Sequence, residues 1–300
     1  MKNLKKYMMM GALALTMGFT SCSDDDDAVV PTVDLASMNF THEPGEGEIT
    51  LKWNLPGENP GFMYILMEYT DPRDKVTHKQ TISPYTDELV IPNTRARYGA
   101  NYSFKFTPYS ETGTPGTSFV LENCKSNAAP ATTTVERIPI NIQGYSTNAQ
   151  DPVEGPLNEM FDGNRGTFFH SSWHEPSPDN HWVTVDLGEA VTRLEIVTVN
   201  RNGGGSNPSQ VKLYKVESLE QEDTDIDNPI YSYEHKNRGS GGEFQQMCPM
   251  QTEPEFKEPV RFLRYSAVGG NTKFWHLAEF AVNKIVLHVY NPETDEEEVE

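Results

Sequence analysis

Apolar residues alternate with polar ones along most of the chain, and this pattern restricts the fold more than any other feature. Within residues 29–285, no apolar repeat of 3.6 residues persists beyond two turns. Alternation instead recurs in short segments, such as residues 49–55, 102–106 and 183–187. Such segments are typical of strands with one buried face. Clusters of Gly, Pro, Asn and Asp at residues 56–60 and 203–208 favour β-sandwiches over βαβ units. The predicted class is all-β.

Residues 1–21 have the composition of a signal peptide. Three lysines precede an apolar stretch at residues 7–19, and small residues lead up to Cys22. This arrangement resembles a bacterial lipoprotein signal, in which the cysteine is acylated and becomes the new N-terminus. The aspartates at residues 24–27 resemble the acidic signal that directs Bacteroides-type lipoproteins to the outer face of the outer membrane. The resemblance implies lipidation at Cys22 and an outer-membrane protein facing the cell exterior. The alternative is a secreted protein with an acidic tail.

The chain is strongly acidic, with a formal net charge of −20 at pH 7. A surface of this charge repels phosphate backbones and anionic lipid headgroups, and no basic stripe offsets it. Nucleic acid is therefore excluded as a partner, and contact with a membrane is expected through the lipid anchor only. Cys124 and Cys248 are far apart in sequence, and the sequence does not settle whether they form a disulfide.

Composition divides the chain into segments. The polar residues 22–34 are expected to form a lipidated, acidic tether, followed by one domain at residues 35–134 and another at residues 138–287. Residues 126–134 contain no large apolar side chain, so they are expected to be a linker or a last edge strand. Residues 288–300 form an acidic tail, in which the run at residues 292–298 is too charged to pack and is expected to fray.

The first domain has the length and strand spacing of an immunoglobulin or fibronectin type III sandwich. Residues 47–56, 67–70 and 98–109 resemble the fibronectin-like N-terminal modules of polysaccharide-utilisation lipoproteins. Trp53 alternates in step with Ile49 and Leu51, which predicts a core position. The alternative is an exposed Trp53 that stacks on sugar. No motif in this domain carries chemistry, so a spacer is expected.

Three blocks of sequence distinguish the second domain. They are residues 161–173 (FDGNRGTFFHSSW), 181–188 (HWVTVDLG) and 277–282 (LAEFAV). Together they resemble the coagulation factor V/VIII type C, or discoidin, domain. The resemblance implies a galactose-binding-like jelly-roll sandwich for the second domain, after the immunoglobulin/fibronectin-like sandwich of the first. It does not identify one ligand, because function in such folds resides in the loops.

The sequence Asp162-Gly163-Asn164 predicts a sharp turn in which Gly163 adopts a positive φ angle. A turn of this kind can direct several oxygen atoms to one point, and calcium prefers oxygen ligands. In the factor V/VIII type C family this loop holds a structural calcium ion. The resemblance implies a calcium site made by the Met160 carbonyl, Asp162, Asn164, Thr167 and Glu279. The alternative is an Asx-turn without metal.

Three histidines raise the question of a zinc site. His170 and His174 have i, i+4 spacing, which converges on a metal only in a helix. The Ser, Pro, Asp and Asn residues around His174 and up to His181 favour a loop instead. The sequence therefore predicts a loop at residues 171–181 on the rim of the sandwich rather than a zinc site.

Aromatic and hydrogen-bonding residues in the loops indicate a sugar site. The C–H face of a sugar stacks on an aromatic ring while its hydroxyls bind polar groups, and Trp173 and His174 offer both. Sugar-binding members of the resembled family use an Arg at a strand end, an Asn a few residues later and an aromatic in a late loop. The resemblance implies Arg201, Asn207 and Trp275 for these roles. Either Trp could alternatively belong to the core.

The predicted function is a non-catalytic, cell-surface lipoprotein that captures a polysaccharide or oligosaccharide. A polysaccharide-utilisation system would provide an outer-membrane glycan transporter as a partner. No nucleophile elbow, metalloprotease helix or phosphate loop is present in the sequence, and close carboxylate pairs are expected by chance in so acidic a chain. The alternatives are an adhesion or assembly module that binds a protein and an unrecognised glycan-acting enzyme.

Overall fold

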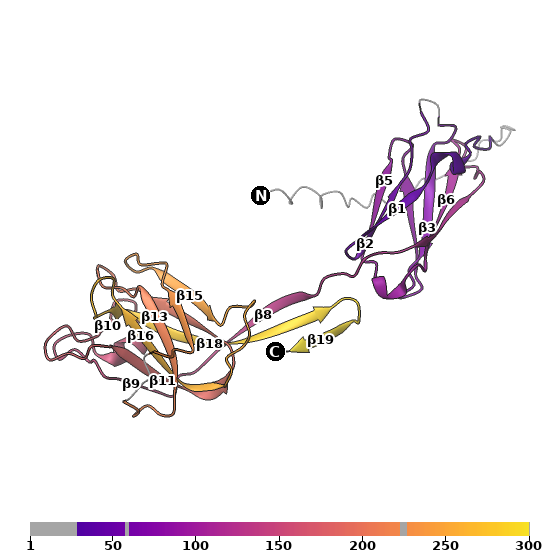
Figure 1. Cartoon of the computed structure of the whole chain (residues 1–300). Coiled ribbons are helices and arrows are strands. Elements are labelled where there is room, and N and C mark those ends of the chain that lie inside the picture. Colours follow the sequence, from indigo (N-terminus) through magenta and orange to yellow (C-terminus); the bar gives the residue numbers. More distant parts are fainter. Residues whose placement is uncertain (1–28, 58–59, 223–226, 300) are drawn as a thin grey trace. The chain divides into compact units, whose positions relative to one another are not determined.

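The computed structural model describes residues 29–57, 60–222 and 227–299. The expected signal peptide, the lipidation site at Cys22 and the aspartate run lie outside these residues. The chain divides into two compact units between Ala129 and Pro130 (Figure 1). The described residues form strands and three short 3-10 helices, which confirms the predicted all-β class. Within the described ranges, no helix is long and apolar enough to span a membrane.

The first unit consists of two antiparallel sheets. Its strands are β1 (Thr41–Gly45), β2 (Glu48–Lys52), β3 (Tyr64–Thr70), β4 (Thr77–Ile82), β5 (Glu88–Pro92), β6 (Tyr102–Tyr109) and β7 (Phe119–Cys124), and its 3-10 helices are η1 (Leu35–Met38) and η2 (Ala96–Tyr98). One sheet has the order β1-β2-β5 and the other the order β4-β3-β6-β7. Alternate residues of β2 and β6 are buried in one hydrophobic core. The two alternating segments predicted in this unit are therefore strands.

Two aromatic residues of the first unit bury polar atoms without losing their hydrogen bonds. Trp53 packs against Phe106 and is only 5% exposed, which confirms its predicted core position. Its Nε1–H donates to the Thr86 carbonyl over 2.6 Å. The hydroxyl of the fully buried Tyr102 accepts from the backbone N–H of Arg95 over 2.8 Å. Buried indole and phenol groups need such partners, so these bonds fix both rings in place.

The second unit is also built from packed antiparallel sheets. Its strands are β8 (Thr132–Pro139), β9 (Gly144–Thr147), β10 (Phe169–His170), β11 (Trp182–Val191), β12 (Leu194–Val199), β13 (Gln210–Val216), β14 (Tyr231–Glu234), β15 (Glu243–Cys248), β16 (Val260–Val268), β17 (His276–Leu277), β18 (Glu279–Asn291) and β19 (Glu296–Val299), with helix η3 (Leu157–Phe161). One sheet has the order β14-β13-β16-β11-β9. The other has the order β15-β12-β18-β19, with β8 on the free side of β18. Strands β10 and β17 form a separate pair. This jelly-roll arrangement agrees with the predicted fold.

A single hydrophobic core joins the strands of the second unit. Val183, Val185 and Leu187 of β11 alternate inward, as their pattern predicts. They belong to a cluster that includes Phe169 from β10 and Trp275, next to β17. The short pair β10 and β17 therefore contributes large aromatic side chains to the core.

Strand β18 extends into a ribbon that the sequence did not predict. Its residues 279–284 pair with β12, whereas residues 283–290 pair with β8 and residues 288–291 pair with β19. From Thr132 on, the expected linker is therefore an edge strand of the second unit. The expectation of a frayed acidic tail is wrong up to Val299, because β18 and β19 form a hairpin.

The two remaining cysteines are free thiols. Cys124 and Cys248 are both buried and belong to different units. Burial raises the pKa of Cys124 to about 11, and burial likewise raises the pKa of Cys248. Both thiols are thus protonated and unreactive at neutral pH.

Candidate functional site

One end of the second unit gathers the loops that hold the predicted site. Strand pairing sets Val199 beside Glu279, Gln210 beside Val268 and Trp182 beside Ser266. These residues lie at or near the ends of their strands, so the loops attached to them leave the sandwich at the same end. We call this end the rim, formed by residues 151–156, 171–181, 200–209 and 269–275. In Figure 1 it is the end of the second unit near β10.

Asp151 connects two rim loops, a role that the sequence analysis did not predict. It is 4% exposed. Its carboxylate accepts the backbone N–H groups of Val153, Glu154 and Trp173 over 2.9 to 3.2 Å, and it lies 2.8 Å from Nδ1 of His174. Burial alone would raise the pKa of Asp151, but these hydrogen bonds outweigh burial and lower the pKa below its usual range. Asp151 is therefore an anion that fixes the positions of Trp173 and His174.

Trp173 presents an aromatic ring at the rim, as predicted. Its side chain is 48% exposed, and its Nε1–H donates to Glu154 over 3.2 Å. The His174 ring lies 4.0 Å from the Trp173 ring. Because Asp151 holds Nδ1 of His174, the Nε2 atom of that ring is left for other partners. The two predicted residues thus lie side by side with complementary chemistry.

Arg201 lies next to the same group. Its guanidinium stacks on the ring of Phe168 at 3.5 Å from the centroid, and its Nη2 is 3.9 Å from a carboxylate oxygen of Glu154. Glu154 therefore contacts both Arg201 and Trp173, although the sequence did not single it out. A cation, a carboxylate and an indole converge here, and they can bind hydroxyl groups beside an apolar face.

The prediction that Trp275 is an exposed stacking residue is wrong. Trp275 is 0% exposed and packs edge-on against Phe169 and Tyr265, with ring centroids 5.3 and 5.4 Å away. It fills the core, where no ligand can reach its face. The neighbouring Phe274 is the half-buried aromatic of this late loop, and its ring lies 5.8 Å from that of His170.

Asn207 is also buried rather than open to a ligand. Only 1% of it is exposed, and its amide nitrogen donates to the Arg238 carbonyl over 3.1 Å. Asn200 binds the same segment through Asn237 and Gly239. The prediction that Asn207 reaches a ligand from the surface is therefore wrong, because its amide group holds the loop that joins β14 to β15.

The loop after Arg201 requires glycine at one position for a steric reason. A Cβ atom on Gly204 would lie 2.2 Å from the imidazole of His276, so no other residue fits there without displacing that ring. The backbone N–H of Ser206 donates to Nε2 of His276 over 3.2 Å. His276 is buried, and burial lowers its pKa to about 4. A neutral imidazole thus supports the loop that carries Arg201.

The three histidines considered for zinc have separate partners. Nδ1 of His170 bonds the Ser171 carbonyl, His174 bonds Asp151, and His181 lies between the hydroxyls of Ser171 and Ser177. Among the described residues, these histidines do not belong to a group of three possible ligands with donor atoms within 4.8 Å. This arrangement agrees with the loop that the sequence predicts.

The turn predicted to bind calcium follows η3. Gly163 has a φ angle of +74°, as predicted. Asp162 accepts the backbone N–H of Asn164 over 2.7 Å and the hydroxyl of Thr167 over 2.8 Å. Oε1 of Glu279 is buried without a hydrogen-bond partner among the described residues. Burial, followed by repulsion from Asp162, raises the pKa of Glu279. Two carboxylates with one unpartnered buried oxygen fit a cation, and Met160 precedes them at the end of η3.

Comparison with known proteins identifies the second unit. A model of the F5/8 type C domain matches residues 141–280. The second unit is thus similar to F5/8 type C domains, and we call it the F5/8 type C domain after this match. No curated protein matches the chain.

Several solved structures resemble the F5/8 type C domain. The family 32 carbohydrate-binding module of NanJ from C. perfringens, in complex with galactose, is 16% identical and has a TM-score of 0.36, covering 50% of this chain and 100% of that one. The C-terminal domain of a chitobiase from Bacteroides fragilis is 18% identical with a TM-score of 0.36, covering 50% and 99%. A module from Clostridium perfringens in complex with GalNAc-β-1,3-galactose is 18% identical with a TM-score of 0.33, covering 46% and 93%.

Proposed function

We propose that the protein is a non-catalytic glycan-binding lipoprotein and that the rim of its F5/8 type C domain holds the sugar. The observation that carries the proposal is the exposed Trp173, with Glu154 and Arg201 beside it. The indole would stack on the C–H face of a sugar ring, while Arg201 and Glu154 would bind its hydroxyls. His174 would add a hydrogen bond through Nε2.

The side chains of the rim favour a weak, shallow site. A surface indole and two charged groups bury little area, so we expect dissociation constants between micromolar and millimolar. Many copies on one cell would increase the overall avidity. Capture of a long polysaccharide before transport through the outer membrane suits such a site, and a glycan transporter would be the partner.

The test is calorimetry of the purified chain against a glycan that it binds on an array. Trp173→Ala should reduce affinity by about 5- to 30-fold, equivalent to ~1 to 2 kcal/mol of lost stacking. Arg201→Ala should reduce it comparably, because sugar hydroxyls lose a charged partner.

Tyr85→Ala is the matched control, since Tyr85 is an exposed aromatic residue of the first unit. Wild-type affinity in folded Trp173→Ala and Arg201→Ala would contradict the site. Binding of a protein but no glycan would favour the adhesion alternative.

We also propose a structural calcium ion at Asp162, Asn164, Thr167, Glu279 and the Met160 carbonyl. The unpartnered oxygen of Glu279 and its repulsion from Asp162 support a cation here. The ion would neutralise charge and brace the turn. Thr167 directly precedes Phe168, on which Arg201 stacks, so a braced turn would also steady the sugar site.

Calcium should therefore raise the melting temperature of the F5/8 type C domain. A ligand at a hundredfold excess over its dissociation constant adds roughly 2.7 kcal/mol to the stability of the folded state. Tryptophan fluorescence follows this domain well, since Trp173, Trp182 and Trp275 all belong to it. Asp162→Ala should abolish the shift, whereas Asp179→Ala, at an exposed aspartate, should retain it. If a chelator leaves the melting temperature of calcium-loaded wild-type protein unchanged, the calcium site is disproved.

The first unit we propose to be a fibronectin-like spacer. Its three-plus-four strand arrangement and the bond from Arg95 to the Tyr102 hydroxyl support this assignment, since a tyrosine that bonds upstream backbone in this way marks immunoglobulin-like sandwiches. With Cys22 acylated, the spacer and tether would hold the F5/8 type C domain outside the cell.

A further inference from the structure

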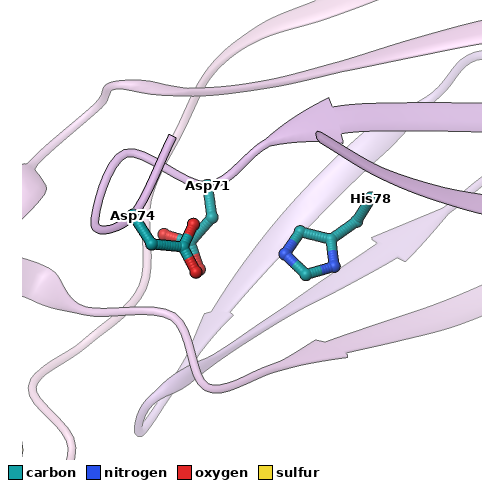
Figure 2. Close-up of side chains that lie close together, drawn as sticks. All are labelled: Asp71, Asp74 and His78. Carbon is teal, nitrogen blue, oxygen red and sulfur yellow. The ribbon is translucent and has the colours of Figure 1, made fainter. Parts of the chain in front are cut away.

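Two carboxylates and an imidazole meet at one end of the first unit. Asp71 and Asp74 belong to the turn between β3 and β4, and His78 belongs to β4 (Figure 2). One donor atom from each residue lies within 4.8 Å of the other two. Among the described residues, this is the only group of three His, Cys, Asp or Glu side chains with that property.

The hairpin places these side chains near one another through several independent contacts. His78 pairs with Tyr69 across the two strands, and their rings stack at 4.9 Å with an interplanar angle of 19°. Asp71 accepts the backbone N–H of Arg73 over 2.8 Å, and Asp74 accepts that of Val76 over 2.9 Å. Each carboxylate thus uses Oδ1 in the turn. Oδ2 of Asp74 remains for a ligand, whereas Oδ2 of Asp71 lies 3.6 Å from the Arg73 guanidinium.

Burial and hydrogen bonding indicate that the group is not satisfied by the protein alone. Asp71 is only 4% exposed, and among the residues that the structure describes the one cation paired with it is the guanidinium of Arg73, 3.6 Å away. His78 is exposed, and within the described part of the chain neither of its ring nitrogens has a hydrogen-bond partner in the protein. A cavity of about 310 Å³ opens beside Asp71 and His78. A buried carboxylate, an unpartnered imidazole and open space therefore adjoin one another.

We propose that Asp71, Asp74 and His78 bind a divalent transition-metal ion of the zinc class. A donor set of two carboxylate oxygens and one imidazole nitrogen suits zinc, whereas calcium prefers oxygen ligands alone. Bonds of ~2.0 to 2.2 Å require the donor atoms to approach to about 3.4 Å. Asp74 and His78 are exposed, so their side chains can rotate to close the site, and water would complete the coordination. The ion would clamp the β3–β4 turn.

The test is calorimetric titration of zinc chloride into the purified full chain at pH 7.5, with calcium present to saturate the other proposed site. The wild type should bind zinc in the first unit, and His78→Ala and Asp74→Asn should each weaken this binding at least tenfold. His42→Ala is the matched control, because it removes another imidazole from the same unit. Asp71 is left unchanged, because it is buried and a substitution there would disturb the fold as well as the site.

Ring-nitrogen NMR distinguishes this site from zinc held by histidines of the second unit. The His78 resonances should shift on addition of zinc, and removal of the zinc with a chelator should reverse the shift. Zinc affinity that is unchanged in folded His78→Ala and Asp74→Asn would overturn the proposal. Unshifted His78 resonances at saturating zinc would overturn it as well.

Discussion

Trp173 and Trp275 show what a single residue's sequence context can and cannot reveal. Both lie in polar loop segments beside a histidine, so the sequence alone does not distinguish an exposed tryptophan from a buried one. The structure exposes 48% of Trp173 and none of Trp275. The difference arises from Phe169 of β10 and Tyr265 of β16, whose rings pack edge-on against Trp275 in the core. Trp173 and Arg201 could be predicted from local pattern and resemblance, but Asp151 could not, because its four partners meet only after folding.

The role of Asp151 leads to a prediction at the same scale. Asp151→Asn keeps the shape of the side chain but removes the charge that accepts from His174 and three backbone groups. Hydrogen bonds to a charged group contribute about 1.5 to 3 kcal/mol, so glycan affinity should fall about tenfold or more as Trp173 and His174 lose their fixed positions. Calorimetry measures this loss.

Asp179→Asn provides the comparison, since Asp179 is exposed in the same loop and should bind as wild type. The Asp151→Asn variant should still give the circular dichroism spectrum of a folded β-protein. Undiminished glycan affinity in that variant would show that Asp151 does not position the site.

At the scale of elements, β8 and β19 are strands that the alternation of apolar and polar residues did not predict. The sequence Thr132-Thr133-Thr134-Val135 has no large apolar residue, yet Thr and Val favour strands. An edge strand of a ribbon needs no apolar face, so β8 forms without the alternation that reveals β2, β6 and β11. Its partner β18 lies about 150 residues later in the chain. Long-range pairing of this kind leaves no local signal.

His288 should make the ribbon sensitive to pH. Its ring nitrogens lie 3.1 Å from Glu136 of β8 and 3.0 Å from Glu297 of β19. The bond to Glu136, followed by that to Glu297, raises the pKa of His288 above its ordinary value of 6.5. The stabilisation is therefore complete below pH 6.5 and is lost as pH rises through the raised pKa.

Amide exchange, expressed as protection factors, checks this expectation. Protection of β19 should fall several-fold between pH 6 and pH 8.5 in the wild type. His288→Gln should remove the pH dependence, and His42→Gln, in the other unit, should leave it intact. Equal protection of β19 across this range in the wild type would contradict the role of His288.

At the scale of the whole molecule, the order of the two β-sandwich units and the family of the second followed from the sequence. Alternation of apolar and polar residues, together with clusters of turn residues, was sufficient to predict the all-β class. Three separated blocks of sequence were sufficient to predict the resemblance of the second unit to F5/8 type C domains. The anchor at Cys22 remains a prediction. Cys22→Ala should prevent acylation and move the protein from the membrane fraction to the soluble fraction, as measured by immunoblotting. Whole cells of this mutant that stain as strongly as wild type would refute a lipid anchor.

The antiparallel pairing of β8 with β18 has a mechanical consequence. The chain enters the second unit at Thr132, beside Tyr290, whereas the rim adjoins Glu279 at the other end of β18, about 36 Å away at 3.3 Å per residue. With the proposed sugar site and lipid anchor in place, a glycan that drags on the rim would pull β18 from its first residue, and the tether would pull β8 from its first residue in the opposite direction. The eight residue pairs between these strands would thus be loaded in shear and share the force. The pairs would not separate one at a time. The force at which a cell loses a moving polymer would therefore be set by the sugar contacts rather than by unfolding of the domain.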